Sequence, residues 1–139
     1  SRTPLPWDLF PEIYALKELI EPVSQSKFNV CIIQRYPNGK TGIAPHRDKE
    51  IVKGDQKDDQ EILLSGKIVG FSIGATRILR LTPPSFLSQC KFIDVPLTSG
   101  SLYQINPPTN QYWLHSIEKD STITQPRYSL TFRYIKPDT

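Results

Sequence analysis

The heptapeptide Arg127-Tyr128-Ser129-Leu130-Thr131-Phe132-Arg133 alternates polar and apolar side chains from end to end. Because successive side chains of a β-strand point to opposite faces of a sheet, the alternation predicts a strand whose two faces differ in chemistry. The polar face would hold Arg127, Ser129, Thr131 and Arg133. The aromatic and β-branched residues are typical of a central strand, so we expect the two arginines to face the interior of the fold.

Other short segments have the same strand-like composition and are bounded by turn residues. They cover residues 28–36, 67–73, 77–81, 91–95 and 101–105, and the heptapeptide itself extends to a strand over 127–135. Several short strands at such intervals indicate a sandwich or barrel. The pattern therefore predicts a mainly β fold of the α+β class.

Two segments differ from these strands. Residues 11–21 place Ile13, Leu16 and Ile20 at helical spacing, and Pro22 follows as a helix end. Residues 49–61 mix acidic and basic side chains with few apolar ones, which predicts a solvated loop. We therefore expect one N-terminal flanking helix and one polar loop.

The composition limits the class of protein. The chain has 139 residues, of which 37% are hydrophobic and 22% are charged, and its formal net charge is +3. This length suits a single domain. No apolar run approaches the ~18 residues of a membrane-spanning helix, so no membrane partner is expected. The modest positive charge suits an anionic partner such as nucleic acid without requiring one.

The start of the chain and its cysteines bear on its origin. The chain contains no Met, so Ser1 is not a natural translation start, and residues 1–20 lack the layout of a signal peptide. We therefore expect a fragment of a longer protein. Cys31 and Cys90 lie in strand-like segments, where a free thiol behaves as a small hydrophobic group. Free cysteines favour an intracellular, reducing compartment, either the nucleus or the cytoplasm.

The chain contains only two histidines, so any chemistry that needs imidazole must use His46, His115 or both. His46 and Asp48 end a strand-like segment two residues apart, a spacing that puts side chains on one face about 6.6 Å apart. Two histidines and one carboxylate form the facial triad of non-haem Fe(II) oxygenases, whereas a closed zinc site normally needs four protein ligands. A surface His–Asp pair and a core histidine are the ordinary alternatives.

The two arginines of the heptapeptide would supply the second part of an iron site. Their α-carbons would lie about 20 Å apart at ~3.3 Å per residue, so two long side chains leaning together would hold a short dicarboxylate. A guanidinium meets a carboxylate with two parallel hydrogen bonds, which Lys cannot form. Ser129 and Thr131 would add hydroxyl donors. 2-Oxoglutarate is the natural candidate for this anion.

Several longer stretches carry a resemblance to a known family. In chain order they are residues 28–36 with Gly39, His46-Arg47-Asp48-Lys49-Glu50, residues 71–77, Gly100-Ser101-Leu102, Pro108-Thr109-Asn110, Trp113-Leu114-His115-Ser116, Pro126-Arg127 and residues 130–133. With this order and spacing the chain resembles the AlkB family of Fe(II)- and 2-oxoglutarate-dependent nucleic-acid dioxygenases, nearest its DNA-repair demethylases. The resemblance covers roughly residues 28–135. It implies a double-stranded β-helix, or jelly-roll, core with an N-terminal flanking helix, in a single dioxygenase domain over residues 1–139.

The resemblance also implies roles for individual residues. His46, Asp48 and His115 would bind iron, and Arg127 and Arg133 would hold the carboxylates of 2-oxoglutarate. The other residues implied at the co-substrate are Tyr36, which supplies a hydroxyl, Ser129, at a position of Asn or Ser, and Gln34, where the family commonly has the shorter Asn.

Substrate contacts are implied at fewer positions. Glu50 falls where an acidic side chain meets the exocyclic amine of a flipped base, although an idle surface glutamate is the alternative. The cations Arg47, Arg77 and Lys49 are candidates for phosphate contacts, and Trp7 is a candidate for stacking on a base.

The implied reaction is oxidative demethylation, a dealkylation repair of N-methylated bases such as 1-methyladenine and 3-methylcytosine in DNA or RNA. It uses Fe(II) and O2, couples decarboxylation of 2-oxoglutarate to succinate, and releases formaldehyde from a base that has left the stack. The partner would be methylated nucleic acid, and we expect a monomer. Two alternatives are a 2-oxoglutarate dioxygenase acting on a protein or small molecule and a catalytically inactive nucleic-acid-binding module. The family's base-covering lid would lie upstream of about residue 4, which implies a trimmed or reduced lid.

Overall fold

The computed structural model describes residues 3–52 and 60–136, and strands make up most of its regular structure. One four-stranded sheet has the order β1-β10-β5-β8 and the other has the order β2-β9-β6-β7. The strands of the first sheet are β1 (Val30–Tyr36), β10 (Arg127–Arg133), β5 (Ile68–Gly74) and β8 (Leu102–Ile105). Those of the second are β2 (Ile43–His46), β9 (Leu114–Ile117), β6 (Arg77–Thr82) and β7 (Ile93–Leu97).

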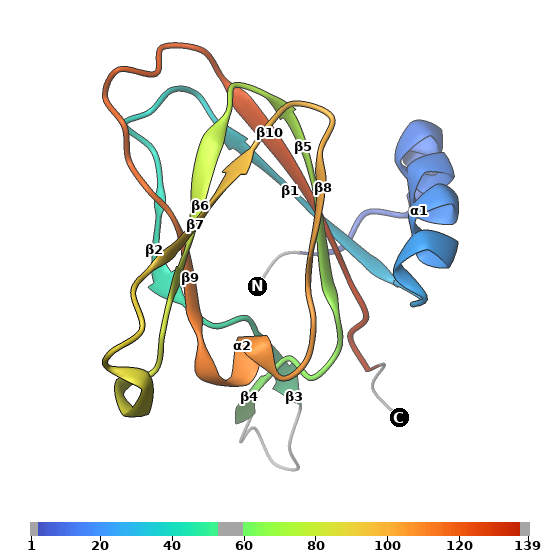
Figure 1. Cartoon of the computed structure of the whole chain (residues 1–139). Coiled ribbons are helices and arrows are strands. Elements are labelled where there is room, and N and C mark those ends of the chain that lie inside the picture. Colours follow the sequence, from blue (N-terminus) through green and yellow to red (C-terminus); the bar gives the residue numbers. More distant parts are fainter. Residues whose placement is uncertain (1–2, 53–59, 137–139) are drawn as a thin grey trace.

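The remaining elements flank these two sheets (Figure 1). They are helix α1 (Pro11–Ser24), the short helix α2 (Thr109–Tyr112), the 3-10 turns η1 (Trp7–Leu9) and η3 (Ser85–Leu87), and the hairpin of β3 (Lys49–Val52) and β4 (Gln60–Leu63). Every strand pairing is antiparallel. Two such sheets with one N-terminal helix are consistent with a jelly-roll core, so the predicted fold class is confirmed.

Strand β10 is central in its sheet, as its alternating sequence predicts. It pairs with β1 on one side and β5 on the other, so that Tyr36 lies opposite Arg127 and Gln34 lies opposite Ser129. Partners directly across an antiparallel pair point to the same face. The register therefore brings the polar side chains of β1 and β10 together on the inner face of the sheet.

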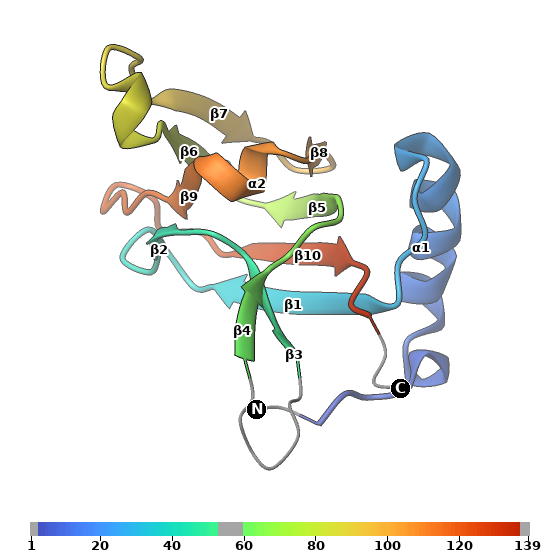
Figure 2. The same cartoon turned by 90° about the horizontal axis from the view of Figure 1, so that it is seen from below.

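The outer face of the same sheet packs under helix α1 (Figure 2). Phe132 is 0% exposed and forms one cluster with Val69, Leu130, Ile20 and Phe28. Ile20 belongs to α1 and contributes the apolar spacing noted in residues 11–21. Because the apolar residues of β10 face the helix, its arginines and hydroxyl side chains face inward.

The helix extends beyond its predicted end. Pro22 was expected to end it, but α1 runs to Ser24, with Pro22 inside its last turn. The chain leaves the helix through Gln25, whose left-handed φ of 54° ends the helical hydrogen bonding. The buried carboxylate of Glu21 then accepts the backbone N–H of Phe28 at 2.8 Å. This contact, rather than the proline ring, fixes the path from the helix into β1.

The expectation of a solvated loop over residues 49–61 is wrong at both ends. Residues 49–52 and 60–63 pair as strands β3 and β4, with Glu50 opposite Ile62. Backbone hydrogen bonds make this hairpin, which is why the charged composition did not reveal it. The middle of the segment, residues 53–59, lies outside the described residues.

A glycine on the inner face of the first sheet leaves space for the ring of a tyrosine. A Cβ added at Gly70 would lie 2.1 Å from the Tyr103 ring, so only glycine fits beneath it. Gly70 and Tyr103 are register partners in β5 and β8. The missing side chain thus lets Tyr103 lie across the sheet, where it lines the interior cavity.

Two smaller expectations concern cysteines and membranes. Cys31 is partly buried and Cys90 is exposed, and both are free thiols. Burial raises the pKa of the Cys31 thiol to about 11, as expected for a packing residue. Among the described residues, no helix has the length and apolar content needed to cross a bilayer.

Replacing Phe132 by Ala tests the placement of β10 in the core. The variant should lose about 3–5 kcal/mol in free energy of unfolding, the cost of removing a buried aromatic side chain. Leu19→Ala on the solvent side of α1, where the side chain is exposed, should change it by less than about 0.5 kcal/mol. Denaturant unfolding followed by circular dichroism measures both. Equal losses in the two variants would contradict this core.

Candidate metal centre and co-substrate cavity

The two histidines and Asp48 meet at one end of the second sheet. His46 is the last residue of β2 and lies directly opposite His115 of β9, with a register irregularity in the same strand pair. Asp48 follows β2 by two residues. One potential ligand atom from each residue lies within 4.8 Å of the other two. The structure therefore brings together the three residues predicted from the sequence.

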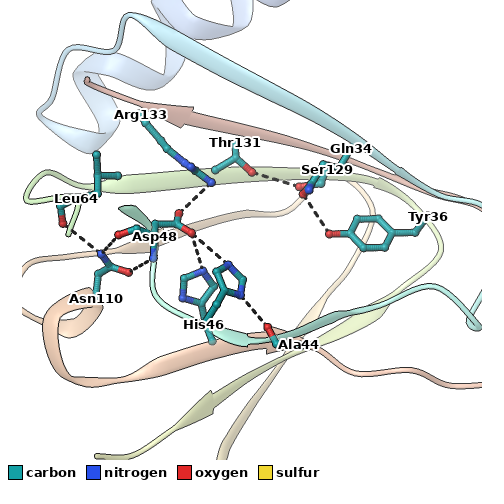
Figure 3. A network of polar contacts seen from close by, with 11 residues as sticks. Gln34, Tyr36, Ala44, His46, Asp48, Leu64, Asn110, Ser129, Thr131 and Arg133 are labelled. Atoms are coloured by element: carbon teal, nitrogen blue, oxygen red, sulfur yellow. Dashed lines mark hydrogen bonds and ion pairs between the residues drawn. The ribbon is translucent and has the colours of Figure 1, made fainter. Parts of the chain in front are cut away.

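Distances within this group are short enough for a shared cation. Oδ1 of Asp48 lies 3.2 Å from Nε2 of His46 and 3.3 Å from Nε2 of His115 (Figure 3). The two imidazole ring centroids are 4.3 Å apart. Asp48 is buried, His115 is buried and His46 is half-buried. Three potential ligand atoms this close together match facial coordination of a metal.

The hydrogen bonding of His46 orients its ring toward this group. Nδ1 of His46 lies 2.8 Å from the carbonyl oxygen of Ala44. Since a carbonyl only accepts, Nδ1 carries the proton, and in the neutral ring Nε2 keeps its lone pair for a metal. The hydrogen bond to Asp48 raises the pKa of His46.

Asp48 is held ionised despite its burial. Burial opposes ionisation, but hydrogen bonds from His115 and His46 and the charge of Arg133 outweigh it and keep the pKa of Asp48 well below its usual range. Nη2 of Arg133 lies 2.9 Å from Oδ2 of Asp48. This contact is ionic rather than an aligned hydrogen bond, because Oδ2 has no hydrogen-bond donor among the described residues.

A buried asparagine fixes the backbone around Asp48. Oδ1 of Asn110 accepts the N–H of Asp48 at 2.9 Å, and its Nδ2 donates to the carbonyls of Asp48 at 3.0 Å and Leu64 at 3.2 Å (Figure 3). No role was predicted for Asn110 from the sequence. The sequence signals are its place in the Pro108-Thr109-Asn110 stretch of the resemblance and its position five residues before His115, whereas the partners that define its role are 62 and 46 residues away.

The cavity continues from the metal ligands along the inner face of the first sheet. It is lined by the polar side chains of β10 and β1 that were predicted at the co-substrate: Arg127, Ser129, Arg133, Gln34 and Tyr36. Thr131 lines it too, so the predicted polar face of β10 points into one cavity together with the three candidate metal ligands. Within it, the hydroxyl of Tyr36 donates to Oε1 of Gln34 at 3.3 Å.

Arg127 lies at the end of the cavity away from Asp48. Its Nη2 donates to Oγ of Ser72 at 2.9 Å, and its guanidinium carbon is 5.1 Å from the Tyr36 ring centroid. Its Nε and Nη1 are buried without a hydrogen-bond partner among the described residues. A buried guanidinium with two free donors is suited to binding an anion. Arg133 marks the other end of the cavity, next to Asp48.

Two of the predicted substrate residues lie near the metal ligands. Arg47 is exposed between His46 and Asp48, and its Nη1 donates to the carbonyl of Gln111 at 3.4 Å. Glu50 is 5% exposed, and its Oε2 has no partner among the described residues. The alternative of an idle surface glutamate is therefore wrong.

The other two, Arg77 and Trp7, make contacts within the fold. Arg77 is 1% exposed and donates to three backbone carbonyls, those of Asn38, Thr41 and Glu118. A phosphate cannot reach it, so the expected contact at Arg77 is wrong. Trp7 packs against the core cluster under α1, with its ring centroid 6.0 Å from that of Tyr14. It does not line the cavity, and its packing accounts for it without a base.

Comparison with known proteins agrees with this geometry. A family model described as the 2OG-Fe(II) oxygenase superfamily matches residues 1–133. The chain belongs to the 2OG-Fe(II) oxygenase superfamily. The family uses Fe(II), 2-oxoglutarate and O2, which are the cofactors predicted from the sequence, and the His-Asp-His group is in place for the metal.

Curated relatives narrow the resemblance within this superfamily. "DNA oxidative demethylase ALKBH2" of Bos taurus is 32% identical over 144 residues, covering 99% of this chain and 47% of that protein. The human protein of the same name is 32% identical over 138 residues, covering 96% of this chain and 49% of that protein. "Alpha-ketoglutarate-dependent dioxygenase alkB homolog 3" of Mus musculus is 28% identical over 134 residues, covering 92% and 44%. The predicted resemblance to the AlkB family is confirmed, and the chain spans about half the length of these relatives.

The residues of this oxygenase fit both the metal and the co-substrate. Two imidazoles and one carboxylate leave coordination positions open, as a non-haem Fe(II) centre requires. Three buried guanidinium nitrogens of the cavity-lining arginines, Nε and Nη1 of Arg127 and Nε of Arg133, have no partner among the described residues. A diacid lying between these arginines would satisfy them. The donor set is thus suited to iron, and the cavity beside it is suited to a dicarboxylate.

Replacing Asn110 by Ala tests its role in holding Asp48. Loss of its three hydrogen bonds should weaken metal binding by about 10–100-fold, the usual effect of removing a group that orients a metal ligand. Mn(II), as a redox-inert stand-in for Fe(II), allows the affinity to be measured by calorimetry. Asn110→Asp, which keeps the acceptor and loses the donors, should also weaken it. Gln111→Ala is the matched control, because the hydrogen bond from Arg47 to Gln111 uses the backbone carbonyl, which the substitution keeps. Equal affinities for all variants would refute the role.

Proposed function

We propose that this oxygenase removes methyl groups oxidatively from N-methylated bases in nucleic acid, using Fe(II), 2-oxoglutarate and O2. The observation that carries the proposal is the cavity shared by His46, Asp48 and His115 with Arg127 and Arg133. Support for the substrate class comes from the relatives, two of which are named DNA oxidative demethylases. Methylated adenine and cytosine, such as 1-methyladenine and 3-methylcytosine in DNA or RNA, are the proposed targets.

In this proposal each of the three protein ligands gives the metal one donor atom. His115 and Asp48 provide buried donors, and His46 provides a half-buried donor whose ring is oriented by Ala44. Bound iron would supply oxidation by O2, coupled to decarboxylation of 2-oxoglutarate to succinate, with the hydroxylated methyl group leaving the base as formaldehyde. Because Asp48 stays ionised, the group offers a charged oxygen to the metal over the whole physiological pH range.

The arginines would orient the co-substrate from opposite ends. Arg133 lies beside Asp48, so it would meet the carboxylate of the keto acid end near the metal. Arg127 lies at the far end with Ser72 and Tyr36, where it would take the distal carboxylate. The Tyr36 hydroxyl would add a hydrogen bond. Burial raises the pKa of Tyr36 despite the opposing charge of Arg127, so this hydroxyl keeps its proton as a donor.

Glu50 and Arg47 would act on the nucleic acid. Glu50 has a buried carboxylate oxygen free to accept a hydrogen bond from the exocyclic amine of a flipped base. Arg47 is exposed next to the metal ligands, where it would contact a phosphate and make binding sensitive to salt. We also propose that residues 1–139 act as one catalytic domain, as a monomer, in the nucleus or the cytoplasm.

The direct test combines the protein with Fe(II), 2-oxoglutarate and methylated oligonucleotides and measures formaldehyde and succinate. The wild type should release both, and His46→Ala or Asp48→Ala should abolish turnover because one metal ligand is lost. Turnover only with a peptide or small-molecule substrate would replace the proposal by another dioxygenase activity. Metal uptake without turnover, together with oligonucleotide binding, would indicate a binding module.

Replacing Arg127 by Lys tests the co-substrate end of the cavity. A point charge replaces a planar fork, so the variant should need a higher 2-oxoglutarate concentration, seen as a raised KM. Arg35→Lys is the matched control, because Arg35 lies exposed on the same pair of strands and bonds the Tyr128 hydroxyl. An unchanged KM for Arg127→Lys would show that Arg127 does not hold 2-oxoglutarate.

A further inference from the structure

A pair of exposed aromatic rings, one of them on helix α2, has no role in the reaction described above. Phe86 belongs to η3 and Tyr112 is the last residue of α2. Their ring centroids are 5.9 Å apart and the ring planes are at 84°, an edge-to-face contact. Phe86 is 70% exposed and Tyr112 is 48% exposed. Figure 2 shows α2 beside the turn between β6 and β7 that contains η3.

Helix α2 links this pair to the candidate metal ligands. Asn110, two residues before Tyr112, bonds the backbone of Asp48 on both sides, and β9 with His115 begins two residues after Tyr112. Arg47 donates to the carbonyl of Gln111, the residue before Tyr112. Helix α2 therefore contacts Phe86 through Tyr112, Arg47 through the carbonyl of Gln111, and the backbone of Asp48 through Asn110.

The two rings hold each other in place. Single exposed apolar side chains are ordinary on protein surfaces, but these rings come from two elements far apart in the sequence and contact one another. An edge-to-face contact stabilises the rotamers of both, while each ring keeps a large part of its surface open. The pair is thus an ordered aromatic surface rather than two loose side chains.

We propose that Phe86 and Tyr112 form a stacking platform for unpaired bases next to the target nucleotide, with Arg47 on the adjoining phosphate. This inference rests on the proposed function and concerns whether its nucleic-acid substrate is single-stranded or double-stranded. A ring stacks only on a base whose face is free, which paired and stacked bases lack. The platform therefore favours single-stranded or locally opened nucleic acid. The cation beside the rings and their continuity with the metal site favour this occupant over a protein.

The test measures binding of fluorescent oligonucleotides to the full chain by anisotropy, as a single strand and as a duplex of the same sequence. Phe86→Leu and Tyr112→Leu should each weaken single-strand binding by roughly 5- to 100-fold, the usual effect of removing a stacking ring. Duplex binding should change far less. Phe86→Trp should retain single-strand affinity, because the ring face is kept.

Phe92→Leu is the matched control. Phe92 is 57% exposed and lies 4.8 Å from the Arg80 guanidinium, outside the Phe86–Tyr112 contact, so its loss should leave single-strand binding unchanged. The salt dependence of binding should persist in Phe86→Leu, because stacking releases no counterions, and should diminish in Arg47→Gln.

The outcomes separate the platform from the proposed function. Wild-type formaldehyde release with single-strand affinities unchanged in both Leu variants would overturn the platform and leave the activity standing. Absence of both binding and formaldehyde release with every oligonucleotide would overturn both. Self-association of the wild type that Phe86→Leu abolishes, with oligonucleotide binding unchanged, would reassign the rings to a protein interface and also overturn the platform.

Discussion

The ionised carboxylate of Asp48, buried between two imidazoles and a guanidinium, is the contact on which the site depends. Taking a carboxylate out of water is costly unless it is paired and hydrogen-bonded, and Arg133, His46 and His115 together provide that pairing. The backbone of Asp48 is held just as firmly. Its carbonyl accepts hydrogen bonds from Leu64 at 2.9 Å and from Asn110 at 3.0 Å. The end of β2, the start of the β3–β4 hairpin and α2 therefore meet at this residue.

Strand β10 connects this charge to the hydrophobic core. Phe132 and Leu130 pack toward α1, while Arg133 and Thr131, one residue from each, face the cavity. A slip of one residue in the pairing would put arginines in the core and aromatic rings in the cavity. The cluster under α1 therefore fixes the register of β10, and the register keeps both arginines on the cavity face of the sheet. Core packing and co-substrate geometry are in this way set by the same seven residues.

The parts of this structure that the sequence predicted are those with a local pattern. Alternation in residues 127–133 identified β10 and its inward arginines, and the scarcity of histidine identified His46 and His115. The strands β2 and β9, each of four residues, are too short for a pattern, so their pairing across the sheet was not foreseen. The features that could not be predicted depend on tertiary contacts, which leave no local pattern in the sequence. Asn110 gained its role from backbone groups 62 and 46 residues away.

Arg77 and Arg127 show why residue type and spacing alone misassign a cation. Both are about equally buried, and both guanidinium carbons lie near the Tyr36 ring, at 5.6 and 5.1 Å. The difference is in their hydrogen bonds. Two nitrogens of Arg77 donate to three backbone carbonyls, whereas one nitrogen of Arg127 donates to Ser72 and the other two have no partner among the described residues.

Because of these hydrogen bonds, Arg77 stabilises the fold and Arg127 is suited to binding an anion. The carbonyls around Arg77 satisfy both of its terminal nitrogens within the fold itself, and its Nε alone lacks a partner among the described residues. Arg127 carries donors that folding leaves unpaired, and such a group destabilises the protein until an anion reaches it. Burial also lowers the pKa of Arg77, and the charge of Arg127 adds to that shift, so the two cations repel one another across the cavity wall. An incoming carboxylate at Arg127 would relieve both costs at once, and that is the physical reason this end of the cavity favours an anion.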